Sequence, residues 1–247
     1  MIGKKAFTLA EVLITLGIIG VVAAMSIPTL IANINSAKFS SQFKKSFATL
    51  NQAALMSQNH YDFDFAGADA ACTSDGSDDP KTVNSICALL NGTLSGITSY
   101  MDSRDLPNGY MFLPGAVRTP SIVKLNGMAI YRMADGSFFV FPKTAKSGCS
   151  LEPGQKLDNY IWDLIDGGCY GYIDVNGEAK PNIEVNCGNY SYVDTVPSSP
   201  CLVAKNSTQM TDVYPVVYHD GVLEPATNAA SYVLSGGTPT KLQVWEK

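Results

Sequence analysis

The sequence predicts an α+β fold in which one long N-terminal α-helix packs on a small antiparallel β-sheet. The first observation is a helical pattern that runs from residue 8 to residue 58. The second is a set of strand-like segments in the second half of the chain, joined by tight turns and not by regularly alternating helices. This order is typical of α+β proteins. The third is six cysteines, all beyond the helix, which predict a loop-rich, disulfide-bounded C-terminal region.

The first half of the predicted helix is apolar on every side. The 26 residues from 12 to 37 carry no charge. At about 1.5 Å of rise per residue they extend roughly 39 Å, which exceeds the roughly 30 Å of a membrane's hydrocarbon layer. Glu11 lies at the start of this segment. Pro28 lies inside it and predicts a kink, because proline removes one backbone donor.

The second half of the predicted helix is amphipathic. Its apolar residues recur every three or four positions, as in a helix with one buried stripe: Phe39, Phe43, Phe47, Leu50 and Ala54. Polar residues fill the other side: Ser40, Gln42, Lys44, Lys45, Thr49 and Asn51. Because no linker separates the two halves, a single helix is the simplest interpretation.

The rest of the chain divides into loops, short helices and strands. Residues 62–80 are rich in Asp, Gly and Ser and predict an exposed loop. Thr82 is the expected N-cap of a short helix that Asn91-Gly92 ends. The predicted helices span 83–90 and 226–234, and the predicted strands span 110–113, 128–133, 137–141, 170–175, 213–219, 221–223 and 242–245. Turns at Ala134-Asp135-Gly136 and Asp220-Gly221 predict two antiparallel hairpins.

Charge is distributed unevenly along the 247 residues. The formal net charge is −5, yet the first 45 residues carry five lysines against Glu11 alone. The remainder therefore carries nine net negative charges. Because phosphate binding needs clustered Lys and Arg, we do not expect nucleic acid as a partner of this acidic part.

The cysteine spacing favours disulfides over a metal site. An even number of cysteines in an exported chain predicts disulfides, and no cysteine lies near a histidine in the spacing of a zinc site. Six cysteines allow 15 pairings. Our hypothesis pairs sequence neighbours: Cys72 with Cys87, Cys149 with Cys169, and Cys187 with Cys201.

No catalytic motif is visible in the sequence. His60 and His219 are the two histidines, and neither has a recognisable partner in sequence, so we expect no enzyme activity. We also expect no cofactor. Asp174, Asn176 and Asn182 offer oxygen atoms of the kind calcium prefers, but their spacing does not match the twelve-residue calcium loop, and turn roles are the expectation.

The segment from Lys4 to Glu11 reads Lys-Lys-Ala-Phe-Thr-Leu-Ala-Glu and resembles the processing signal of type IV prepilins and type II secretion pseudopilins. The resemblance implies cleavage between Ala6 and Phe7 by a prepilin peptidase, and N-methylation of Phe7. Pro28 falls where the helix of that family often kinks. The implied organisation is a leader peptide (1–6), a transmembrane and filament-core half of the helix (7–37) and a globular pilin-like periplasmic domain (38–247), in which residues 38–58 form the amphipathic half.

The same resemblance implies a function. It implies a structural subunit of a type IV pilus-like filament or of a type II secretion pseudopilus. The implied partners are other pilin or pseudopilin subunits in a helical filament, the prepilin peptidase and an inner-membrane assembly platform. The implied location is the bacterial inner membrane, as a single-pass protein with a periplasmic C-terminal domain, and then a periplasmic or extracellular filament. Residues 174–182 are similar to a stretch in many pilin-like secretion proteins and slightly favour a pseudopilin or minor pilin.

Glu11 needs a partner for its charge. A carboxylate within an apolar membrane helix costs about 2.5–3.5 kcal/mol on insertion scales. Our hypothesis is that it pairs with the Phe7 amine of a neighbouring subunit in a filament; the alternative is that it only reaches the lipid headgroups. Two other functional classes remain open. One is a secreted binding or hydrolytic protein with a conventional signal peptide cut near residues 22–26, and the other is a single-pass membrane-anchored sensor.

Overall fold

The computed structural model describes residues 8–100, 127–144, 149–153, 164, 167–179, 212–226 and 228–235. The strands predicted over 110–113 and 242–245 lie outside these ranges. So do Cys187 and Cys201, whose predicted pairing stays a prediction.

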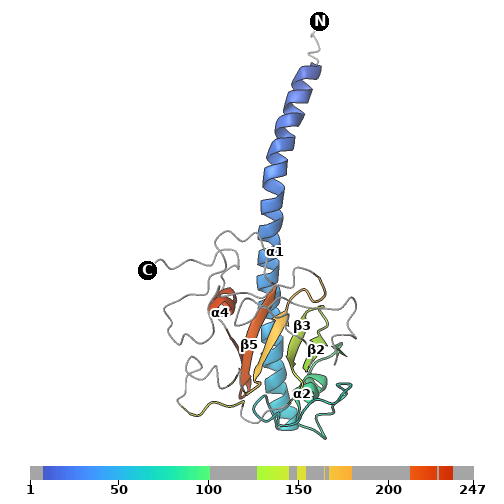
Figure 1. The fold of residues 1–247 in the computed structure, drawn as a ribbon, viewed down its shortest axis with the longest axis vertical. Coiled ribbons are helices and arrows are strands. Elements are labelled where there is room, and N and C mark those ends of the chain that lie inside the picture. Colours follow the sequence, from blue (N-terminus) through green and yellow to red (C-terminus); the bar gives the residue numbers. More distant parts are fainter. Residues whose placement is uncertain are drawn as a thin grey trace.

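One long helix dominates the fold. Helix α1 spans Leu9–Tyr61, which is 53 residues, and therefore extends about 80 Å. Its helical residues continue through Pro28 without a break, and the predicted kink there stays a prediction. The helix ends where Asp62 adopts a left-handed conformation, with φ of 65°. Figure 1 shows that the first half of α1 projects beyond the rest of the protein, whereas its second half lies against the sheet. The prediction of a single continuous helix is confirmed.

A six-stranded antiparallel sheet follows in a simple meander. Its spatial order is that of the chain: β1 (Thr98–Tyr100), β2 (Met128–Arg132), β3 (Phe138–Pro142), β4 (Tyr170–Asp174), β5 (Val213–His219) and β6 (Val222–Pro225). Each strand pairs antiparallel with the next. Both predicted hairpins are confirmed. The sequence reading missed β1, because three residues are too short for an alternating pattern to stand out.

Two short helices complete the described elements, α2 (Ile86–Thr93) and α4 (Asn228–Leu234). The prediction that Thr82 caps α2 was wrong. Ser85 is the N-cap, and its side chain accepts a hydrogen bond from the Ala88 N–H. Thr82 instead belongs to the preceding turn, where its N–H donates to the Asp79 carbonyl at 2.9 Å.

The sheet is buried on both faces. The main core joins α1 and α2 to the alternate residues Ala129, Tyr131, Phe139, Phe141, Ile173, Tyr214, Val216 and Tyr218. The intervening residues Met128, Ile130, Phe138, Val140 and Val213 form a second cluster, against which Tyr100, Tyr170 and Tyr172 pack. The strands therefore read as nearly continuous apolar runs in place of the alternation expected when one face is solvated.

Apolar and polar contacts together fix the second half of α1 on the sheet. Phe43 is fully buried and stacks on Tyr214, with ring centroids 4.2 Å apart. The Ser46 and Ser137 hydroxyls are 3.0 Å apart in the core. The Asn51 amide forms two hydrogen bonds with the backbone of Leu223, accepting from its N–H at 2.8 Å and donating to its carbonyl at 3.3 Å.

One ion pair joins α1 to the β2–β3 turn. The Lys45 ammonium lies 3.1 Å from Asp135. Partial burial raises the pKa of Asp135, but the hydrogen bonds from Ser137 and the Lys45 charge outweigh that effect, and the net pKa lies below its ordinary value. A lowered carboxylate pKa stabilises the fold above the unfolded-state pKa, and this contribution disappears as the pH falls through the folded-state pKa.

Two expectations about exposure were wrong. Ser40, assigned to the polar side of α1, is buried. The loop over residues 62–80 is not wholly exposed, because Phe63, Phe65 and Ala68 enter the main core. Asp78 in the same loop is also buried, and its carboxylate accepts hydrogen bonds from the Thr73 N–H and hydroxyl. The composition of the loop predicted exposure to solvent because its acidic residues outnumber its aromatic residues. The few aromatic residues nevertheless determine how the loop packs.

Two of the three predicted disulfides are present. Cys72 pairs with Cys87 and Cys149 pairs with Cys169, with Cα atoms 5.6 and 5.5 Å apart. The first joins the loop after α1 to α2. The second joins residue 149 to the residue that precedes β4.

We predict that breaking the Cys149–Cys169 disulfide by a double Cys→Ala substitution lowers the free energy of unfolding by about 2–4 kcal/mol, because the cross-link restricts the unfolded chain.

Non-reducing peptide mapping by mass spectrometry checks all three pairs in the unmodified protein. A Cys187–Cys149 or Cys187–Cys169 peptide would contradict the neighbour-with-neighbour pairing.

We predict that Phe43→Ala destabilises the fold by about 3–5 kcal/mol, because it leaves a cavity between α1 and Tyr214. The matched control is Leu55→Ala on the same helix, where the side chain is 58% exposed and the expected loss is below about 0.5 kcal/mol. Thermal unfolding followed by near-ultraviolet circular dichroism measures both. Equal losses would show that α1 is not anchored at Phe43.

Candidate functional site

The candidate site is the start of α1. Thr8 is the N-cap, with extended backbone, and the Glu11 N–H donates to its hydroxyl at 3.3 Å. In return, the Glu11 carboxylate accepts from the Thr8 N–H at 2.8 Å and from the Thr8 hydroxyl at 2.9 Å. This reciprocal arrangement is a capping box, which satisfies donors that the first helical turn leaves unpaired. Its negative charge also lies at the positive end of the helix dipole.

The role of Thr8 in holding Glu11 was missed at the level of sequence. The signal was present, because Thr-x-x-Glu before an apolar run is the capping-box pattern. The sequence analysis identified Glu11 as an isolated charge but did not identify Thr8 as its hydrogen-bond partner. Ala6 and Phe7, the predicted cleavage and methylation residues, lie outside the described residues.

The segment that follows the capping box is apolar and unburied. Residues Leu9–Pro28 have a mean hydropathy of 2.2, and none of them is buried within the protein. Large side chains such as Leu13, Ile19 and Met25 are 61%, 63% and 74% exposed. The segment is long and apolar enough to cross a membrane, and it fits membrane anchoring.

Small residues interrupt this apolar segment on one side. Gly17, Gly20 and Ala24 are spaced by three and four residues and therefore share a face of the helix. A Cβ atom added at Gly17 or Gly20 would meet nothing within 4 Å. Glycine in a helix interior costs about 1 kcal/mol relative to alanine, and no packing within the described chain requires it at these two positions.

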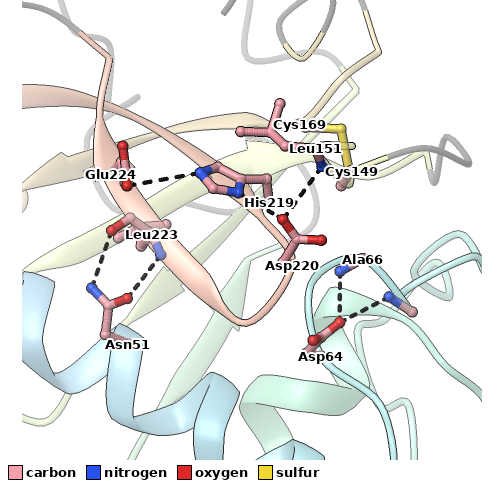
Figure 2. Close-up of polar contacts among 11 residues, drawn as sticks. Asn51, Asp64, Ala66, Cys149, Leu151, Cys169, His219, Asp220, Leu223 and Glu224 are labelled. Atoms are coloured by element: carbon pink, nitrogen blue, oxygen red, sulfur yellow. Dashed lines mark hydrogen bonds and ion pairs between the residues drawn. A yellow bond between two sulfur atoms is a disulfide. The ribbon is translucent and has the colours of Figure 1, made fainter. Parts of the chain in front are cut away.

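His219 has neighbours that the sequence reading did not recognise. Its ring Nδ1 lies 2.9 Å from the Asp220 carboxylate and its Nε2 lies 3.9 Å from Glu224 (Figure 2). Asp220 is adjacent in sequence, whereas Glu224 approaches because the β5–β6 hairpin folds back. His60, by contrast, is exposed in the last turn of α1.

The residues considered for calcium have structural roles where the structure describes them. Asp174 is buried at the end of β4, and its carboxylate accepts from the N–H groups of Asn176 and Gly177 at 3.2 and 3.0 Å. This is the turn role expected from the sequence. Asn182 lies outside the described residues, so the turn role expected for it stays a prediction.

Cys72, Asp78 and Cys87 also lie close enough together to suggest a metal cluster. The two sulfur atoms form the first disulfide, however, and are not available as thiolate ligands.

Comparison with known proteins identifies the N-terminal segment. A search of curated proteins found no match, and a search of solved structures found none either. Residues 1–27 match the family model of the prokaryotic N-terminal methylation motif. The matched residues contain the capping box and most of the exposed apolar segment. The chain therefore carries the type IV pilin and pseudopilin signature on an α+β, pilin-like fold.

Proposed function

We propose that the protein is a structural subunit of a type IV pilus-like filament or of a type II secretion pseudopilus. A prepilin peptidase would cut between Ala6 and Phe7, and Phe7 would be methylated. The subunit would wait in the inner membrane through the first half of α1, with its sheet domain in the periplasm. An assembly platform would then move it into a helical filament with other subunits. This role is structural and not catalytic.

One observation carries the proposal. The methylation motif (residues 1–27) extends into the same continuous helix that carries the exposed apolar segment and packs on the sheet. Any force on the globular domain would therefore be transmitted directly to the apolar segment in the membrane. Packing of many such segments against one another would bury the surface that the single chain leaves open, and head-to-tail contacts that do not close generate a filament.

Glu11 fits this sequence of events. Within one chain its carboxylate has Thr8 as a partner, but no positive charge among the described residues is paired with it. The α-amine that cleavage would create at Phe7 lies four positions earlier in sequence. We propose that this amine, on a neighbouring subunit, pairs with Glu11 during assembly and offsets the cost of a carboxylate in an apolar surrounding.

The competing functions differ in where the mature chain begins. A conventional secreted protein would lose the apolar segment, and a membrane-anchored sensor would keep its lysines. Neither gives a reason for the methylation motif to adjoin the helix that the domain packs on.

We predict that the protein purified from its native membrane begins at N-methylated Phe7, as measured by intact mass and N-terminal peptide sequencing. A start near Ser26 would identify a secreted protein and contradict the proposal. An intact Met1 would favour the anchored sensor.

We predict that Glu11→Gln reduces filament assembly at least tenfold, although it retains an acceptor that can complete the capping box. Sheared filaments, quantified against total membrane protein, give the readout. The control is Asp69→Asn, which removes a carboxylate from the exposed part of the loop after α1 and should assemble normally. Normal assembly of Glu11→Gln would show that its capping role is sufficient and that the charge is not needed.

A further inference from the structure

A histidine and two carboxylates gather at the β5–β6 hairpin (Figure 2). His219 ends β5, Asp220 follows in the turn, and Glu224 lies on β6. Val217 is the direct partner of Glu224 in the β5–β6 register, and His219 lies two residues beyond Val217. His219 and Glu224 are therefore diagonal neighbours on one face. The intervening Tyr218 and Leu223 belong to the main core on the other face.

Asp220 fixes the tautomer of His219. Because a carboxylate only accepts hydrogen bonds, the ring Nδ1 that lies 2.9 Å from Asp220 must carry the hydrogen. In the neutral ring, the lone pair on Nε2 is then available. Asp220 is itself held in place, since its N–H donates to the Cys149 carbonyl at 2.7 Å and its carboxylate accepts from the Leu151 N–H at 3.3 Å. A carboxylate behind the distal ring nitrogen is the arrangement that orients metal-binding histidines.

The Nε2 atom of His219 is buried and makes no hydrogen bond. The side chain is only 9% exposed, and the Glu224 oxygen at 3.9 Å lies beyond hydrogen-bonding range. A buried acceptor without a donor costs about 1–3 kcal/mol. A cation between Nε2 and Glu224 would satisfy both groups, and because the Glu224 side chain is 44% exposed, a cation could enter from solvent.

We propose that His219 and Glu224 bind a first-row divalent transition cation, represented by Zn²⁺, with Asp220 as the positioning residue and water completing the coordination. Imidazole nitrogen suits such metals, whereas Ca²⁺ and Mg²⁺ prefer oxygen ligands throughout. Zinc–nitrogen and zinc–oxygen bonds of about 2.1 Å at a tetrahedral angle separate two ligand atoms by roughly 3.4 Å. The observed 3.9 Å therefore needs only a small movement of the exposed Glu224 side chain.

The test uses the full chain without a histidine tag, purified in detergent micelles and titrated with Zn²⁺ by calorimetry and by thermal unfolding. We expect one Zn²⁺ per chain and a higher Tm, because a ligand that binds only the folded state stabilises it. His219→Gln and Glu224→Gln should each weaken binding at least tenfold. Asp220→Asn should weaken it by about tenfold without lowering the metal-free Tm, since loss of an outer-shell partner typically costs 10–100-fold in affinity.

The chain supplies its own control. His60→Gln removes the exposed histidine at the end of α1 and should leave Zn²⁺ affinity unchanged, and Ca²⁺ should produce no change in Tm. Glu224→Gln alters a half-exposed side chain, so it tests the site even if His219→Gln unfolds.

The proposal is overturned if the unmodified protein binds no Zn²⁺, if Glu224→Gln binds it as tightly, or if only His60→Gln abolishes binding. A Tm that does not respond to Zn²⁺ would overturn it too. None of these outcomes depends on filament assembly.

Discussion

The continuity of α1 through Pro28, which has no backbone N–H to donate, is the constraint on which the rest of the structure depends. Because the helix continues from its capped start at Thr8 to Tyr61, its apolar and amphipathic halves form one rod. Residues Leu9–Pro28 are not buried in the described part of the structure, and the described contacts that join the helix to the domain come from its second half. These contacts include the stacking of Phe43 on Tyr214 and the burial of Leu50, Ala53 and Ala54.

Polar contacts then fix the position and the rotation of α1 on the sheet. Apolar packing alone tolerates small shifts along or around a helix, whereas hydrogen bonds have narrow geometry. Ser46 and Lys45 engage the β2–β3 turn, and Asn51 engages β6. Because β6 is at one edge of the described sheet, the Asn51 amide also satisfies the N–H and carbonyl of Leu223 that an edge strand would otherwise present for unwanted pairing.

Features with a repeating pattern were predictable from the sequence. The period of α1, the apolar run before Phe39 and the two hairpins with their turn residues follow from local rules, and the structure confirms them. The pairing of neighbouring cysteines is confirmed for the two pairs within the described residues, although it rested on proximity in sequence alone.

What could not be predicted depends on contacts between distant segments. Ser85 caps α2 in place of Thr82, because both are good caps and only the packing of Ile86–Leu90 selects between them. The burial of Phe63 and Phe65 requires knowledge of where α1 ends and the chain turns back. The partners of His219 were hidden for the same reason, since Glu224 reaches it only through the register of β5 with β6.

The start of α1 has a sequence that contacts among the described residues do not explain. Gly17 and Gly20 weaken the helix and fill no space in the domain, and the large side chains around them lie open. Glycine at these positions is explained by contact with a surface outside the described chain. That surface is either lipid or another helix that approaches closely over the small residues. The capping box belongs to the same argument. By donating twice to Glu11, Thr8 lowers the cost of a carboxylate while the chain is alone, yet it supplies no opposite charge. The Phe7 α-amine of a neighbouring subunit would supply the positive charge that Thr8 lacks. The sequence from Thr8 to Ala24 thus fits a helix that is stable enough in the single chain and that gains further stability by packing against the helix of a second subunit.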